Sequence, residues 1–105
     1  MLAHNVYFAL HDESGSAQDS LVKAAKKYLA SHPGMIYFAV GRRKTEFQRD
    51  VNDRNFQVCL NIVFADQTAH DAYQKAERHF EFIEEQKSNW KHVRVFDSQL
   101  SEENQ

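Results

Sequence analysis

The chain has 105 residues, which is enough for one domain with a single hydrophobic core. Hydrophobic residues make up 42% and charged residues 27%, which excludes a disordered chain, and the net charge of −2 excludes a strong positive field that would attract nucleic acid or an anionic membrane. The N-terminus lacks the basic segment of a signal peptide, and no apolar run approaches the roughly 20 residues that cross a bilayer. We therefore expect one cytoplasmic domain over residues 1–105, with a core over about residues 4–98 and a C-terminal tail over residues 99–105.

The first predicted strand covers residues 4–10, where His4, Val6 and Phe8 share one face by alternation. A helix follows, and Ser16 is expected to cap its N-terminus. Its apolar residues repeat at helical spacing and predict a buried stripe of Leu21, Ala24, Ala25, Tyr28 and Leu29. The letters SHPG at residues 31–34 predict the end of this helix.

Two more strands are predicted over residues 35–43 and 55–64, with a polar connection over about residues 44–54. The first of them is apolar on both faces, with Met35 and Tyr37 expected on one side and Phe38 and Val40 on the other. The second alternates, and one face is expected to carry Phe56, Val58, Leu60, Ile62 and Phe64.

A second helical region is predicted from Asp66 to about Lys87, and a last strand over residues 90–98. Because each residue of a continuous helix turns by about 100°, the large ring of Phe82 would face water. The expected buried stripe would consist of Ala69, Ala72, Ala76, Phe80 and Ile83. We therefore expect a break near residues 76–78, which would turn Phe82 inward and reorient His79.

The order β-α-β-β-α-β predicts an α+β, ferredoxin-like fold, with a four-stranded antiparallel sheet and two helical regions on one face. The other face would leave bare several apolar side chains, among them Tyr7, Ala9, Cys59 and Val63. We therefore expect a homodimer in which two copies meet through their open sheet faces.

Short motifs follow one another along the chain: H-N-V-Y-F, H-P-G, F-A-V-G, V-F-A-D, A-H-D-A-Y, R-H-F-E-F-I and V-R-V-F-D. Their order and spacing from His4 to Asp97 resemble the stress-responsive α/β-barrel (Dabb) family of the dimeric α/β-barrel superfamily. The resemblance implies two ferredoxin-like subunits that close a barrel between their sheets. Many members are known only as stress-responsive or uncharacterised proteins, so the resemblance assigns no reaction.

Some enzymatic relatives cyclise polyketide-like substrates with a tyrosine and a histidine six residues apart in the second helical region. A further histidine opens their first strand, and Tyr73, His79 and His4 stand at the matching positions here. The resemblance therefore makes these three residues the candidate catalytic set. The superfamily also includes monooxygenases and haem-handling proteins, but no further motif in this chain singles them out.

Two interpretations of Tyr73 and His79 stay open. A neutral imidazole can take a proton from an acidified carbon, and a tyrosine hydroxyl can donate to the developing oxyanion, which describes a cofactor-free cyclase or isomerase. In the other interpretation the two side chains edge a packed helix, and the protein is a stress-responsive dimer that binds a small apolar molecule in a pocket of each subunit. The observation that distinguishes the two interpretations is whether Tyr73, His79 and His4 converge on an accessible cavity, as the enzyme requires.

No metal, cofactor or nucleic-acid site is predicted. The six histidines show neither H-x-H nor H-x-x-x-H spacing, and Cys59 is expected to be a buried, inert thiol. The basic residues of the polar connection alternate with acidic ones, which favours a solvated, self-paired loop over an anion site. RNA binding is disfavoured because Phe56 and Phe64 are expected on the face that also carries Leu60.

Overall fold

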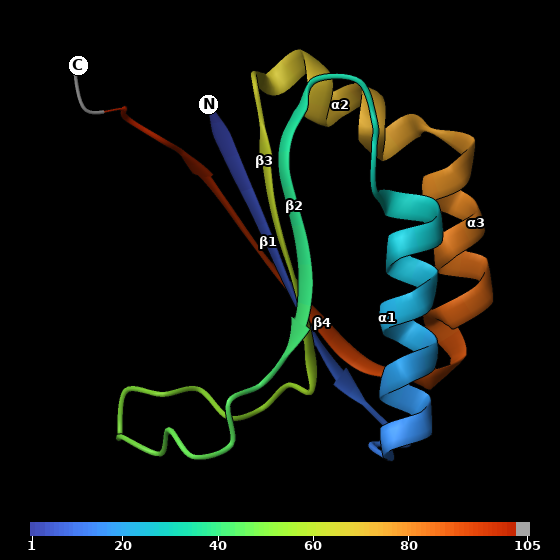
Figure 1. The fold of residues 1–105 in the computed structure, drawn as a ribbon, viewed down its shortest axis with the longest axis vertical. Helices are drawn as coiled ribbons and strands as arrows, with labels where there is room; N and C mark the ends of the chain where they lie inside the picture. The colour runs from blue at the N-terminus through green and yellow to red at the C-terminus, as the bar shows by residue number, and fades with distance from the viewer. Residues whose placement is uncertain (103–105) are drawn as a thin grey trace.

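Four strands form one antiparallel sheet, and helices cover one of its faces (Figure 1). This computed structural model describes residues 1–102, so residues 103–105 of the expected tail lie outside the described part. The elements along the chain are β1 (Leu2–Leu10), α1 (Gly15–Leu29), β2 (Met35–Arg42), β3 (Val58–Phe64), α2 (Gln67–Lys75), α3 (Glu77–Gln86), the short 3-10 turn η1 (Lys87–Asn89) and β4 (Trp90–Gln99). The strand order β2-β3-β1-β4 confirms the predicted ferredoxin-like fold.

The core lies between the sheet and the helices. Antiparallel pairing places His4 opposite Ile62 and Val6 opposite Leu60, so the alternating residues of β1 and β3 point to one face. The four apolar residues predicted within β3 are at most 2% exposed: Val58, Leu60, Ile62 and Phe64. From α1 the buried residues are Leu21, Ala24, Ala25 and Leu29, which confirms most of the predicted stripe.

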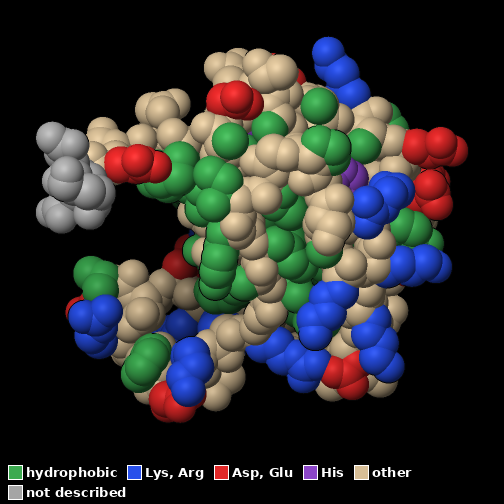
Figure 2. Space-filling model, turned by 45° about the horizontal axis from the view of Figure 1, so that its top comes forward, with side chains coloured by type: hydrophobic (Ala, Val, Ile, Leu, Met, Phe, Trp, Pro, Cys, Tyr) green, Lys and Arg blue, Asp and Glu red, His purple; other side chains and the backbone are tan. Residues whose placement is uncertain are grey.

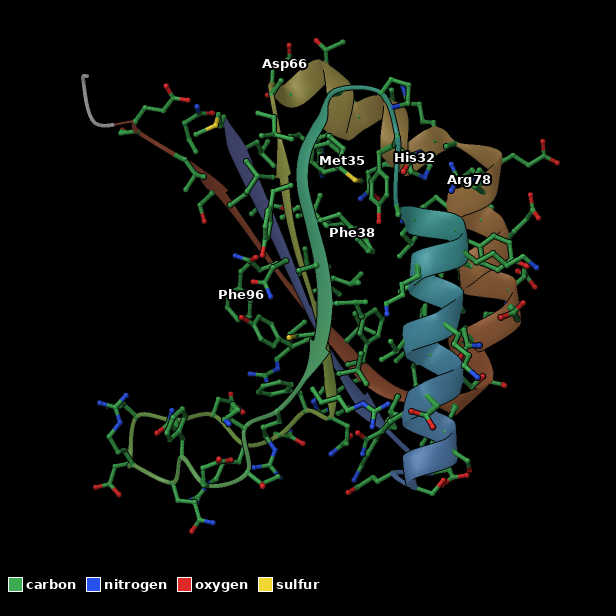
Figure 3. The ribbon with its side chains drawn as sticks, in the orientation of Figure 1. His32, Met35, Phe38, Asp66, Arg78 and Phe96 are labelled. Carbon is green, nitrogen blue, oxygen red and sulfur yellow. The ribbon has the colours of Figure 1, made fainter. Side chains whose placement is uncertain are left out.

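The sequence predicted the wrong sheet face for two side chains, Met35 and Phe56. The pairing of β2 with β3 shifts between Met35 and Tyr37, and Met35 packs against the core together with Phe38 (Figure 3). A register shift of this kind breaks the two-residue alternation on which the prediction rested. Phe56 precedes β3 and packs on Tyr7 of the open face, with ring centroids 4.9 Å apart.

The cap of α1 also differs from the prediction. Ser14, not Ser16, precedes the helix, and its hydroxyl accepts a hydrogen bond from the backbone N–H of Ala17 at 3.2 Å. Ser14 has the extended backbone of a helix cap, so the helix begins at Gly15.

The predicted break in the second helical region is confirmed. Ala76 has an extended backbone (φ −68°, ψ 142°) between α2 and α3. Beyond it Phe82 turns inward, is 3% exposed, and packs against Phe8 and Trp90. The break also changes the buried stripe, because Phe80, expected within it, is 54% exposed.

Gly34 brings the connection between α1 and β2 against α2. Its φ of +78° lies in the left-handed region that favours glycine. A Cβ atom at this position would lie 2.4 Å from the Cβ of Ala69, closer than two carbon atoms can approach. The connection can therefore touch α2 only because residue 34 has no side chain.

The sheet face opposite the helices carries aromatic side chains. Tyr7 packs against Phe56 and Phe96, and both Phe96 and Tyr37 are about half exposed (Figure 3). Figure 2 shows hydrophobic side chains gathered in the middle of the surface, beside a hollow that the β2–β3 connection borders from below. Within residues 1–102, no helix has the length and apolar character required to cross a membrane.

The inward turn of Phe82 predicts a difference between two phenylalanines of the same helix. We expect Phe82→Ala to lower the free energy of unfolding by about 3–5 kcal/mol, because it leaves a cavity against Phe8 and Trp90. Phe80→Ala is the matched control, and we expect a change below about 1 kcal/mol, since Phe80 is largely exposed. Urea denaturation at one fixed protein concentration measures both, and equal losses would contradict the inward orientation of Phe82.

Candidate functional site

A cavity of about 330 Å³ lies between the sheet and helices α2 and α3. Its apolar lining includes Val6, Phe8 and Phe82, and its polar lining consists of His4, His70, Tyr73, Gln74, His79 and Asp97. The cavity opens beside β4, where Val93 and Val95 face the helix side but remain 36% and 50% exposed. The helices therefore leave this edge of the sheet partly uncovered.

The three residues of the predicted catalytic set meet at this cavity. The rings of Tyr73 and His79 lie on opposite sides of the break at Ala76, with centroids 4.9 Å apart. The ring of His4, from β1, lies 5.9 Å from that of Tyr73. Because Phe80 is exposed and Phe82 packs on β1, neither ring fills the space between these side chains.

Asp97 joins the site through the pairing of β1 with the edge strand β4. In the antiparallel register of β1 and β4 it stands opposite His4, and the His4 Nδ1–H donates to its Oδ1 at 2.5 Å. Sequence reasoning did not include Asp97 in the site. The available signal was its alternation with Val93 and Val95 in β4, which places all three on one face.

His70 is a second residue that sequence reasoning missed. Its ring meets that of His4 edge to face at 5.1 Å, and its Nδ1–H donates to Asp71 Oδ1 at 3.0 Å. Its other nitrogen, Nε2, is buried and has no hydrogen-bond partner among the described residues. One ligand atom each from His4, His70 and Asp97 lie within 4.8 Å of one another.

Burial sets the protonation of the polar groups. Desolvation lowers the pKa of His4, and it outweighs the opposing hydrogen bond and charge of Asp97. Desolvation also lowers the pKa of His79, and the positive charges that His4, His32 and His70 would carry lower it further. Burial raises the pKa of Tyr73. At neutral pH His4 and His79 therefore carry neutral imidazoles, and Tyr73 carries a protonated phenol.

Two contacts with α1 hold the break in place. Arg78, just after the break, donates from Nη2 to the backbone oxygens of Lys27 and Ala30 at 3.0 and 2.9 Å. His32 donates from Nε2 to the oxygen of Tyr28, and its ring packs on Tyr73 at 5.0 Å (Figure 3). The end of α1 therefore positions both sides of the site's Tyr–His pair.

The sequence matches the Dabb family, the stress responsive A/B barrel domain, over residues 2–100. The chain belongs to this family. The resemblance inferred from the motifs is thus confirmed. No curated protein matches the chain in sequence.

Solved structures share the Dabb fold at low sequence identity. A Dabb family protein with a ferredoxin-like fold from Mesorhizobium loti has 21% identity, covers 96% of this chain and 97% of its own, and gives a TM-score of 0.77. A dimeric ferredoxin-like protein of unknown function from Thermobifida fusca has 15% identity, 94% and 90% coverage, and a TM-score of 0.78. The hydroxynitrile lyase from Passiflora edulis has 16% identity, 99% and 96% coverage, and a TM-score of 0.75.

A larger hollow of about 560 Å³ lies on the open sheet face of this Dabb domain, under the β2–β3 connection. Its lining combines the aromatic side chains of Tyr7, Phe56 and Phe96 with basic residues of β2, the connection and β4: Arg42, Arg43, Lys44, Arg54 and Arg94. Cys59 also lines it, and burial raises the pKa of that thiol. This hollow contains none of the three predicted catalytic residues.

Two of the basic residues around the connection, Arg42 and Lys44, pair with an acidic side chain. Lys44 pairs with Glu46 within the loop at 3.0 Å, as the self-paired interpretation expects. Arg42, the last residue of β2, pairs with Asp19 of α1, and Asp53 of the loop pairs with Arg94 of β4. The loop is thus tied to the body of the domain by charge pairs at both ends.

Proposed function

We propose that this Dabb protein is a homodimer that binds a small, largely apolar or aromatic molecule in the cavity of each subunit. The observation that carries the proposal is the convergence of His4, Tyr73 and His79 on one cavity whose remaining lining is mostly apolar. Pockets that bind small molecules combine these features, and their volumes begin at about 300 Å³. The cavity therefore suits a compact ligand that presents one or two hydrogen-bonding groups to the imidazole and phenol side chains.

The open sheet face supports the homodimer. Its aromatic residues Tyr37 and Phe96 are about half exposed, and the ring of Phe96 packs against that of Tyr7. Contiguous exposed apolar side chains of this kind mark association surfaces. The Thermobifida fusca protein of the same fold is described as dimeric. A second copy laid sheet against sheet would cover these side chains in both subunits.

A second candidate function is a cofactor-free lyase or isomerase. The specific observation is that His79 Nδ1 is buried without a hydrogen-bond partner within residues 1–102, beside the phenol of Tyr73. In such an enzyme His79 would take a proton from an acidified carbon of the bound molecule, and the Tyr73 hydroxyl would donate a hydrogen bond to the oxygen on which negative charge develops. His4 packs against Tyr73 and positions it. The fold is also that of a hydroxynitrile lyase, at 16% identity.

Ligand binding is tested by thermal shift with a panel of small aromatic and aliphatic carbonyl compounds. A compound present at 100 times its Kd should raise Tm by on the order of 10 °C, since it binds only the folded state. We expect Val95→Phe to abolish this shift, because Val95 lines the cavity and is exposed enough to accept a ring. Val51→Phe, at an 81% exposed position of the β2–β3 connection, should preserve it. A shift that both variants retain would place the ligand elsewhere.

The homodimer is tested by light scattering after size exclusion at micromolar concentration. We expect a mass of two chains for the native protein and of one chain for Phe96→Asp, because the substitution puts a charge in the proposed interface. Phe80→Asp is the matched control, since Phe80 has a similar exposure but lies on α3, on the helix side. A single-chain mass for the native protein would rule out the homodimer.

Catalysis is tested by solvent deuterium exchange into bound compounds that carry a C–H next to a carbonyl, followed by NMR. We expect the protein to accelerate exchange, and His79→Gln and Tyr73→Phe each to slow it by on the order of 100-fold or more, as the loss of acid–base groups does. His11→Gln, at an exposed histidine outside the cavity, should leave the rate unchanged. Binding without accelerated exchange would leave the protein as a binding protein alone.

A further inference from the structure

Three side chains with metal-ligating atoms meet at one end of the cavity, although they are far apart in sequence. His4 comes from β1, His70 from α2 and Asp97 from β4, and one ligand atom of each lies within 4.8 Å of the others. Ligand atoms around a tetrahedral zinc ion lie about 3.4 Å apart, given metal–ligand distances near 2.0–2.1 Å. Side-chain movements on the order of 1 Å therefore bring the set into coordination distance.

The hydrogen bonding of His70 is that of a metal ligand. Its Nδ1–H donates to the carboxylate of Asp71, which fixes the tautomer and leaves Nε2 as an unprotonated acceptor. Nε2 is buried and unpartnered within the described part of the chain. A buried nitrogen lone pair without a partner is unfavourable, and metal-ligating histidines commonly show this pattern of a carboxylate on the opposite nitrogen.

The contact between His4 and Asp97 supplies the other two ligands. Their atoms are 2.5 Å apart, with the His4 side chain 5% exposed and that of Asp97 46% exposed. A metal ion takes the place of the proton that the two groups share, because it coordinates the deprotonated forms of both. Two imidazoles and one carboxylate suit Zn²⁺ and similar ions, whereas Ca²⁺ and Mg²⁺ prefer oxygen ligands throughout.

We propose that His4, His70 and Asp97 bind a divalent transition-metal ion of the Zn²⁺ type, with Asp71 orienting His70. The adjoining cavity leaves room for a fourth ligand, either a water molecule or a polar atom of the molecule in the pocket. This proposal shares His4 with the candidate catalytic set but uses neither Tyr73 nor His79, so variants of those two residues test the proposed function without removing a metal ligand.

The test is isothermal titration of the EDTA-treated, dialysed full chain with zinc chloride. We expect saturable binding of one Zn²⁺ per chain, weakened by at least about 100-fold in His70→Gln, which removes a ligand. Asp71→Asn should weaken binding by roughly 10- to 100-fold, as the loss of an orienting carboxylate does. Asp71 is exposed, so we expect Asp71→Asn to retain the fold. If circular dichroism shows that His70→Gln is misfolded, Asp71→Asn still tests the metal site.

Two further variants separate the possible outcomes. His11→Gln is the matched control, an exposed histidine outside the cluster, and should bind zinc as the native chain does. His79→Gln removes the proposed proton acceptor and should also keep its zinc affinity, so the metal site and the acid–base pair are tested separately. Non-saturable binding, or binding that neither His70→Gln nor Asp71→Asn weakens, would overturn the metal site and leave His4 and Asp97 as a hydrogen-bonded pair.

Discussion

An extended backbone at Ala76 divides the helical segment of residues 67–86 into α2 and α3, and the approach of Tyr73 and His79 in the cavity follows from it. On one uninterrupted helix, Tyr73 and His79 would point about 120° apart. The break brings their rings to 4.9 Å and turns Phe82 toward Phe8. Because Arg78 holds the segment after the break to the carbonyl end of α1, the irregularity is part of the packed fold.

The sheet contributes the second half of the site through strand register. Since directly paired residues of antiparallel strands point to the same face, the pairing of His4 with Asp97 places an imidazole and a carboxylate side by side. A slip of one residue in β4 would carry Asp97 to the opposite face, away from His4. The partly uncovered helix-side face of β4 leaves the Asp97 side chain 46% exposed beside the cavity, whereas His4 is buried.

Alternation and helical spacing predicted the order of elements, the core of β3, and the break near residues 76–78, since each depends on where large apolar rings can be buried. These patterns misplaced Phe56 and Met35, because the end of a strand and a register shift are decided by pairing with a neighbouring strand. They also missed His70 and Asp97. Neither residue has a histidine two or four residues away in the sequence, and their proximity to His4 arises only when three separate elements pack together.

Gly34 has a wider influence than its position in a turn indicates. It lines neither the cavity nor the hollow described above, yet any side chain there would collide with Ala69 of α2. His70 and Tyr73 follow Ala69 on the same helix, so they would move with it. The distance between His4 of β1 and the side chains of α2 therefore depends on the absence of a side chain at Gly34, a residue far from both in the sequence. Sequence drift at residue 34 would change the chemistry of the cavity while leaving all of its lining residues intact.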